Sequence, residues 1–258
     1  MSAVSHTWAS PKESVLPMSP VVPVSCDERI VIFDCDQTLI ENSQMTPAWL
    51  EITRRRGLIE RDVLDTWVRS AGRPMAETVA ETFSVPVEHP LVADVIEEFW
   101  QALSEYEPQA VSGAGEVLAE LDSRGVALYL SSASAPQPLG TWLRILGWER
   151  YFCLILGSDE HTAKGPDHYR RILADTGFTE ETFCLRALTV GDAPYDMRYG
   201  LEQGLALRVG FAPDSERGRL LKPALIAAGA NLVISHLIDL VAIVEHPDPL
   251  ADLHFAVA

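Results

Sequence analysis

Two aspartates stand one residue apart at the end of an apolar run, in the stretch VIFDCDQTLIEN at residues 31–42. Asp34 and Asp36 repel each other, and burial penalises the charged form of both, so the pair needs a nearby positive charge. A divalent cation can supply it, because hard cations such as Mg²⁺ prefer oxygen ligands. A helix cap or a turn needs only one carboxylate, so the pair favours a functional site.

Three further polar clusters follow apolar runs later in the chain. Ser131 and Ser132 follow VALYL, Lys164 lies in HTAKGPD after CLIL, and Asp192 and Asp196 lie in GDAPYD after ALTV. Taken singly, an aspartate after a strand is most often a cap or turn residue, and a lone lysine is a solvated surface charge. If the runs are parallel strands, their carboxyl ends bring acid, hydroxyl and amine to one edge of a sheet.

The apolar runs predict such a sheet. RIVIF (29–33), LALRV (205–209) and NLVI (231–234) join the three runs above, and their apolarity is continuous rather than alternating, as in strands covered on both faces. Segments between them, such as GAGEVLAELDSRG and PDHYRRILADTG, have helical spacing and end in glycine. The expected fold class is therefore α/β, with a doubly wound parallel sheet.

One interval breaks the alternation of strands and helices. Between Ile40 and about Val111 only helical patterns occur: TPAWLEITRRRG, ERDVLDTWVRSAG, MAETVAETF and PLVADVIEEFWQALSEY. A crossover between parallel strands needs only about a dozen residues. We therefore expect an irregular tail rich in Pro and Ser at 1–27, a core domain at 28–41 and 112–258, and an inserted helical cap domain at 42–111.

In this order the motifs resemble those of the haloacid dehalogenase-like hydrolase superfamily, over residues 29 to about 244. The superfamily's DxDxT motif is matched by residues 34–38, its strand-end serine by Ser131, its lysine by Lys164 and its GDxxxD motif by residues 191–196. The helical insertion looks like that of the phosphoglycolate-phosphatase-like and phosphoglucomutase-like branch. The resemblance implies a Rossmann-like core with a helical cap.

The resemblance also implies catalytic roles. Asp34 is the expected nucleophile, attacking phosphorus to form an aspartyl-phosphate, and Asp36 is the expected general acid and base. Asp36 favours C–O–P chemistry, because dehalogenases lack this second aspartate and phosphonatases replace it. Lys164 is expected to neutralise Asp34 and the phosphoryl oxygens, while Ser131 donates a hydrogen bond to the same group.

The cofactor implied is Mg²⁺. Its expected ligands are Asp34, the main-chain carbonyl of Asp36, and Asp192. Asp196 is either a further residue of the metal shell or the partner that orients Lys164.

Three residues are candidates for substrate binding. Backbone donors are expected near Ser132, and Gln37 stands where many relatives have glycine, so its side chain is expected near the rim. Arg73 lies in SAGRPMAE, which looks similar to the loop through which relatives' caps touch substrate, and its planar guanidinium suits carboxylate or phosphate. A further departure is KGPD where relatives often have KPxPD.

Other notable residues in the helical interval have simpler explanations. Arg54, Arg55 and Arg56 favour a solvated helix face with pairs at i,i+4. Trp49, Trp67 and Trp100 sit at helical spacing within apolar faces, which favours core positions over ligand stacking.

Composition excludes several classes of partner. The net charge of −17 at pH 7 argues against nucleic acid and anionic membranes, which need clustered Lys and Arg. No run approaches the ~20 apolar residues of a membrane helix. The four cysteines have no CxxC spacing and the N-terminus lacks a secretory pattern, so a cytoplasmic location is expected.

The leading prediction is a Mg²⁺-dependent phosphatase that acts on a small phosphorylated metabolite. One alternative is an intramolecular phosphomutase of the β-phosphoglucomutase type, which uses the same motifs. Another is a non-catalytic domain that binds phosphorylated ligands, which has no need for the acid–base group of Asp36.

Overall fold

The computed structural model describes residues 29–41, 43–70, 73–104, 106–159 and 162–246, so the predicted tail at 1–27 lies outside the described residues. Its main sheet has six strands, all paired in parallel, in the order β5-β4-β1-β6-β7-β8. The strands are β1 (Ile30–Phe33), β4 (Ala127–Ser131), β5 (Phe152–Leu156), β6 (Ala187–Gly191), β7 (Leu207–Phe211) and β8 (Leu232–Ile234). Each corresponds to one of the apolar runs, which confirms the predicted fold class.

Helices separate consecutive strands of this sheet, and a last helix follows β8. They are α5 (Ala114–Ser123), α6 (Pro136–Leu146), η1 (Glu149–Tyr151), α7 (Pro166–Thr176), α8 (Glu180–Arg186), α9 (Pro194–Glu202), α10 (Glu216–Ala227) and α11 (Asp239–Glu245). None of the helices in the described part of the chain is long and apolar enough to cross a membrane.

Both faces of the sheet are buried, as the continuous apolarity of its strands predicts. Along β1, Val31 and Phe33 join one core cluster with residues of α5, α6 and α11. Ile30 and Ile32 point to the other face and join a second cluster with residues of α7 and α8. Because side chains alternate along a strand, a strand buried on both faces must be apolar at every position.

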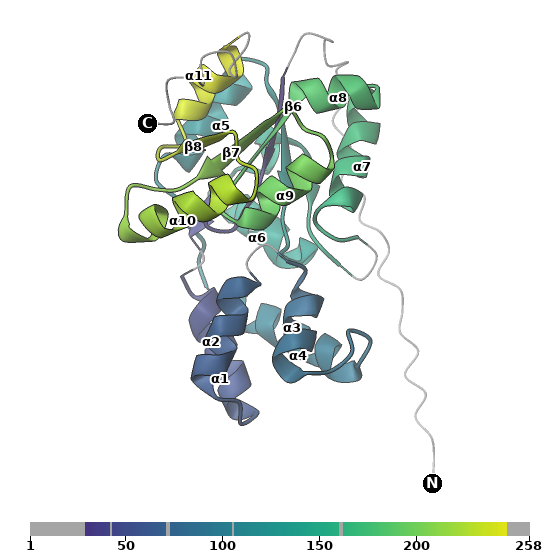
Figure 1. Cartoon of the computed structure of the whole chain (residues 1–258), viewed down its shortest axis with the longest axis vertical. Helices are drawn as coiled ribbons and strands as arrows, with labels where there is room; N and C mark the ends of the chain where they lie inside the picture. Colours follow the sequence, from purple (N-terminus) through teal and green to yellow (C-terminus); the bar gives the residue numbers. More distant parts are fainter. Residues whose placement is uncertain (1–28, 42, 71–72, 105, 160–161, 247–258) are drawn as a thin grey trace.

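The helical interval forms a four-helix unit, which we define as α1 (Met45–Arg55), α2 (Glu60–Arg69), α3 (Met75–Phe83) and α4 (Pro90–Leu103). Figure 1 shows it as a separate layer below the sheet and its flanking helices. A two-stranded antiparallel ribbon, β2 (Ile40–Glu41) and β3 (Gln109–Ala110), pairs the segments at its two ends. This ribbon was not predictable from the sequence, because two residues per strand are too few to form a periodic pattern.

The interior of the four-helix unit is built on aromatic rings. Trp49 is fully buried and stacks on Trp67 at a centroid distance of 5.3 Å, and Phe99 packs edge-on against both. The prediction of a core position is thus confirmed for Trp49. Trp67 and Trp100 are only partly buried and also line a cavity described below.

The predicted solvated helix face is confirmed for Arg54 and Arg55, which are 69% and 53% exposed, whereas Arg56 is only 27% exposed. Arg54 and Arg55 pair with Glu51 at i,i+3 and i,i+4, and Arg56 pairs with Glu98 of α4. These residues stabilise the helix surface and leave no reason to assign them to a ligand.

Candidate active site

Asp34 and Asp192 meet at the carboxyl ends of the two central strands. β1 and β6 are neighbours with Phe33 opposite Val190, so the residues that follow them emerge side by side. The Asp34 N–H donates to the Val190 carbonyl at 2.9 Å. Thr38 ties the two aspartates together: its hydroxyl donates to Asp34 Oδ2 at 3.1 Å and accepts from the Asp192 N–H at 3.1 Å.

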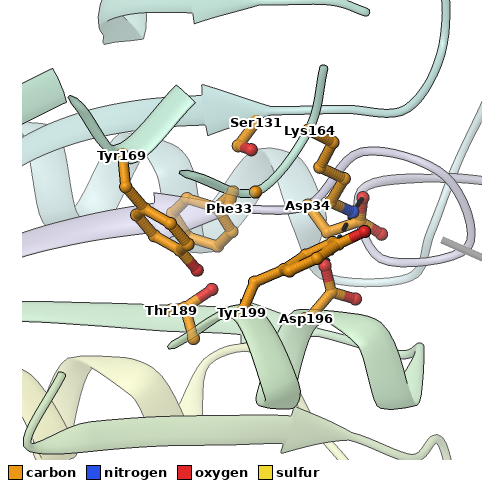
Figure 2. A pocket seen from close by; sticks show the side chains of 9 residues that line it. Phe33, Asp34, Ser131, Lys164, Tyr169, Thr189, Asp196 and Tyr199 are labelled. Atoms are coloured by element: carbon orange, nitrogen blue, oxygen red, sulfur yellow. Dashed lines mark hydrogen bonds and ion pairs between the residues drawn. The ribbon is translucent and has the colours of Figure 1, made fainter. Parts of the chain in front are cut away.

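Lys164 lies between two of the carboxylates. Its Nζ is 2.5 Å from Asp34 Oδ1 and 2.6 Å from Asp196 Oδ1, and all three side chains are at most 5% exposed. Figure 2 shows the amine between the two acids. Burial lowers the pKa of Lys164, but the charges of Asp196 and Asp34 outweigh it and raise that pKa well above its ordinary value. Lys164 therefore carries a fixed positive charge.

Asp196 uses its two oxygens differently. Oδ1 contacts Lys164, while Oδ2 accepts from the Ala193 N–H at 3.1 Å at the start of α9. Burial raises the pKa of Asp196 to about 6, although Lys164 opposes the rise. Gly191 permits this arrangement, because a Cβ at residue 191 would overlap the Asp196 carboxylate. Asp196 contacts Lys164 and also lies in the acidic cluster, so both roles predicted for it stay predictions.

Asp36 is held by two serines from the loop after β4. The Ser132 and Ser134 hydroxyls both donate to its Oδ2, at 3.0 and 2.7 Å. Burial and the negative charge of Asp34 raise the pKa of Asp36 to about 6, while the two serines lower it. Ser132 is fully buried in this contact. The structure thus places Ser132 against Asp36, and its predicted role in substrate binding stays a prediction.

Ser131 contacts a buried histidine, to which the sequence analysis assigned no role. Ser131 Oγ lies 2.9 Å from His168 Nδ1, and His168 Nε2 lies 3.2 Å from the Gly157 carbonyl. Burial, with the charge of Lys164, lowers the pKa of His168 to about 4, so the ring is neutral. A carbonyl only accepts hydrogen bonds, so Nε2 carries the ring proton and Nδ1 accepts the proton of Ser131.

Asp192 has a cationic partner that the sequence did not reveal. Arg217, at the second position of α10, forms an ion pair with Asp192 Oδ2. Burial and the charge of Asp34 raise the pKa of Asp192 to about 7, and Arg217 opposes the rise. Arg217 lies 25 residues beyond Asp192 in a charged segment, and no motif marks it.

The acidic cluster suits a divalent cation. Asp34, Asp192 and Asp196 each offer a carboxylate oxygen, these oxygens lie within 4.8 Å of one another, and all three residues are buried. Together with Asp36, four carboxyl groups face only two cationic side chains, Lys164 and Arg217, so acidic groups are in excess. Oxygen donors with this excess of negative charge fit Mg²⁺. Burial, together with the charge of Asp34, raises the pKa values of Asp192 and Asp196.

A cavity of about 620 Å³ opens above these residues and separates them from the four-helix unit. Asp34, Asp36 and Lys164 line its floor, with Gln37 and Arg217 beside them. Gln37 adopts a left-handed backbone conformation with φ of 62°. Glycine, which many relatives have at this position, adopts that conformation without steric penalty. Its predicted position near the rim agrees with the structure.

Arg73 also lines this cavity, from the start of α3. Its guanidinium donates to Glu77 at 3.0 and 3.1 Å and to Glu81 at 2.7 Å. The hydrogen bond that Arg73 donates to Glu81 raises the pKa of Arg73. Its charge is therefore balanced within α3, and its predicted contact with substrate stays a prediction.

The loop that carries Lys164 accommodates the KGPD departure. Gly165 has φ of 109°, and a Cβ there would lie 3.0 Å from the Tyr199 ring, so glycine suits both the backbone and the space. Pro166 follows at the first position of α7. A backbone N–H there would have no acceptor within the helix, so proline costs no hydrogen bond.

Comparison with protein families agrees with this geometry. The family model described as haloacid dehalogenase-like hydrolase matches residues 31–208, which include the acidic cluster and Lys164. The chain belongs to this family. The predicted family and the prediction of a hydrolase are thereby confirmed. Comparison with curated proteins gives no significant match.

Solved structures share the fold of this haloacid dehalogenase-like hydrolase. One described as a predicted phosphatase from Clostridium acetobutylicum has a TM-score of 0.71 at 20% identity, covering 85% of this chain and 99% of that one. A proposed beta-phosphoglucomutase from Thermotoga maritima has a TM-score of 0.58 at 21% identity, covering 83% and 98%. CbbY from Rhodobacter sphaeroides, in complex with xylulose-(1,5)bisphosphate, has a TM-score of 0.61 at 20% identity, covering 83% and 96%.

Proposed function

We propose that the protein is a Mg²⁺-dependent phosphatase that hydrolyses a small phosphomonoester through an aspartyl-phosphate on Asp34. The observation that carries this proposal is the position of Asp34. It lies on the floor of the cavity, in contact with a buried lysine and beside an excess of carboxylates. Phosphoryl transfer depends mainly on such positioning and charge neutralisation.

Asp34 supplies the nucleophilic oxygen. The Asp34–phosphorus bond forms as the bond from phosphorus to the ester oxygen breaks, and the leaving alkoxide takes a proton. Lys164, held by Asp34 and Asp196, stabilises the negative charge on the phosphoryl oxygens. Because Asp196 holds the amine from the opposite side, Lys164 keeps its position as Asp34 becomes esterified.

Asp36 is the group that supplies the proton. A pKa of about 6 leaves a fraction of the carboxyl protonated near neutral pH, as a general acid requires. Ser132 and Ser134 both donate to one of its oxygens, Oδ2. After the alcohol leaves, the Asp36 carboxylate removes a proton from the water that attacks the aspartyl-phosphate.

Mg²⁺ is proposed to bind the carboxylates of Asp34 and Asp192 and the main-chain carbonyl of Asp36. Asp196 lies close to these ligands. When bound, the cation neutralises phosphate charge and so allows an anion to enter an acidic site. Thr38 fixes the separation of Asp34 and Asp192, and Arg217 holds Asp192.

The four-helix unit acts in this proposal as the cap. It covers the cavity from the side opposite Asp34, and it excludes water and contacts the leaving group. A roofed cavity of this volume fits a small metabolite, because ligand pockets of about 300–1,000 Å³ bury most of a small molecule.

The test is turnover of a broad panel of phosphorylated metabolites by purified protein with Mg²⁺, measured as release of inorganic phosphate. Release of phosphate and alcohol from at least one ester supports the proposal, and no release from any of them contradicts it. An isomerised sugar phosphate without free phosphate would instead identify a phosphomutase. Tight binding of beryllium fluoride without any turnover would identify a non-catalytic domain.

A further inference from the structure

The two ends of the cavity differ in chemistry. The floor carries Asp34, Asp36, Lys164 and Arg217, whereas the roof and walls carry large apolar side chains. The apolar set comprises Met45, Trp67, Val68, Met75, Trp100 and Leu221. A phosphomonoester bound with phosphorus at Asp34 extends its leaving alcohol away from the charged floor and into this apolar part.

Three polar side chains of the roof, those of Trp67, Ser70 and Arg73, are engaged within the four-helix unit. Trp67 Nε1 donates to Thr46 Oγ1 at 2.9 Å, and the Ser70 hydroxyl donates to the Thr66 carbonyl at 2.8 Å. Arg73 is bound by Glu77 and Glu81. A sugar has a hydroxyl on most carbons, and each needs a hydrogen-bond partner once it leaves water. Because the donors of Trp67, Ser70 and Arg73 already have partners, these three side chains do not favour a sugar.

The side chain of Val68 supports the same conclusion. It is 66% exposed although it lines the cavity, and α2 places it beside the partly exposed ring of Trp67. Contact between Val68 and an apolar ligand is favourable in free energy, because it removes both apolar surfaces from water. The rings of Trp67 and Trp100 add flat apolar surface for the same purpose.

We propose that the substrate is the phosphate monoester of an apolar alcohol, an inference that rests on the proposed phosphatase function. The phosphate is held by the charged floor, and the hydrocarbon part of the alcohol packs against the apolar set. Specificity then comes from the area of hydrocarbon buried by α2, α3 and α4 rather than from hydrogen bonds to the alcohol.

The experiment is a series of n-alkyl phosphates from propyl to hexyl, assayed with Mg²⁺ for kcat/KM. All have a primary alcohol as leaving group, so the chemical step is the same and chain length reports burial alone. Each added methylene is expected to raise kcat/KM about fourfold, or about 60-fold from propyl to hexyl. Glucose 6-phosphate and 6-hydroxyhexyl phosphate are expected to be poorer substrates than hexyl phosphate.

Two results separate this inference from the function on which it rests. Turnover that is independent of chain length, or 6-hydroxyhexyl phosphate as good as hexyl phosphate, overturns the apolar alcohol and leaves the phosphatase. No release of phosphate from any ester overturns the phosphatase itself. Benzyl phosphate, compared with hexyl phosphate, then distinguishes an aromatic from an aliphatic alcohol.

Variants locate the contact. Met75→Gln conserves the shape of the side chain, and Val68→Asn changes an exposed residue. Each variant is expected to reduce the ratio of kcat/KM for hexyl phosphate to kcat/KM for propyl phosphate by at least about threefold. Ile59→Asn is the matched control, because Ile59 is 69% exposed, stands at the N-cap of the same helix and lies outside the cavity lining. An unchanged dependence in both variants overturns the proposal, as does an equal loss in the control.

Discussion

Acids and bases pair in two contrasting regions of this molecule. On the cavity floor, the side chains of Lys164 and Asp34 are 4% and 5% exposed, whereas on the four-helix unit those of Arg54 and Glu51 are 69% and 50% exposed. The two pairs have similar distances, 2.5 and 2.9 Å. Solvent exposure is therefore the variable that separates them.

The difference teaches what burial adds to an ion pair. Water screens the exposed pair, and the side-chain entropy lost when Arg54 and Glu51 are held together offsets their attraction. At the floor, screening is weak, so removing one partner leaves a buried charge without compensation. The same burial penalises the charged form of Asp36, Asp192 and Asp196 and so raises their pKa values. The buried floor therefore holds both the carboxyl groups with raised pKa values and the ion pair whose loss is expected to lower the free energy of unfolding most.

The largest expected effect comes from the proposed nucleophile. Asp34→Asn keeps the shape of the side chain but removes the attacking carboxylate, so kcat is expected to fall by about 10⁴-fold or more. Phosphate release in the steady state measures it. Asp122→Asn, an exposed substitution on α5, is the control and should keep full activity. Substantial turnover by Asp34→Asn would exclude the assigned nucleophile.

Removal of the buried lysine should destabilise the fold. Lys164→Met conserves much of the volume but leaves Asp34 and Asp196 facing each other, which is expected to lower the free energy of unfolding by about 3–5 kcal/mol. Urea denaturation of the metal-free protein gives the value. With Arg54→Met as the exposed counterpart, equal losses in the two variants would contradict the comparison.

His168 should make stability depend on pH. Its pKa in the folded protein is about 4, while in the unfolded chain it is about 6.5, so the unfolded state binds more protons between these values. The free energy of unfolding therefore falls as the pH drops from 6.5 to 4, by about 3 kcal/mol from this group.

His168→Asn removes that component of the pH dependence. Urea denaturation between pH 7 and pH 4.5 should show the stability difference between wild type and variant shrinking as the pH falls. His89→Asn is the control, since His89 is exposed at the N-cap of α4. A difference that stays constant with pH refutes the neutral, buried His168.

Magnesium should stabilise the folded protein through the acidic floor. At a Mg²⁺ concentration of about 100 times Kd, the expected gain is about 2.7 kcal/mol, and Asp192→Asn should lose most of it. Thermal unfolding with and without Mg²⁺ measures the gain, and EDTA should reverse it. If Asp192→Asn is stabilised as much as wild type, Asp192 does not hold the ion.

The smallest effect is expected on the outer face of the four-helix unit. Glu51→Gln removes the carboxylate shared by Arg54 and Arg55, yet the free energy of unfolding should change by less than about 1 kcal/mol. High salt should reduce even this change. A loss comparable with that of Lys164→Met would mean that exposure does not separate the two regions.

Much of the fold and of the floor was predictable because local pattern carries them. Each of the six strands lies in a mostly apolar run, as expected for a parallel sheet whose faces are covered by helices. Asp34, Asp36, Ser131, Lys164, Asp192 and Asp196 follow strand ends or begin helices, so parallel topology alone brings them to one edge. Their roles in catalysis and metal binding stay predictions.

Other contacts were not predictable, because they join residues through side-chain packing. Arg217 reaches Asp192 from α10, and His168 reaches Ser131 from α7, with no motif to mark either. Ser132 turned toward Asp36, and Arg73 toward Glu77 and Glu81. Trp67 and Trp100 show the same limit, since helical spacing fits a core position and a cavity wall equally well.

By itself the sequence determined the α/β class, the helical insertion and the order of the charged residues, because periodicity and strand ends are local properties of the chain. Only the tertiary structure decided which acid contacts which base and which side chains line the cavity. Those choices depend on distances of a few ångströms between segments far apart in the chain, and burial then sets the strength of each contact.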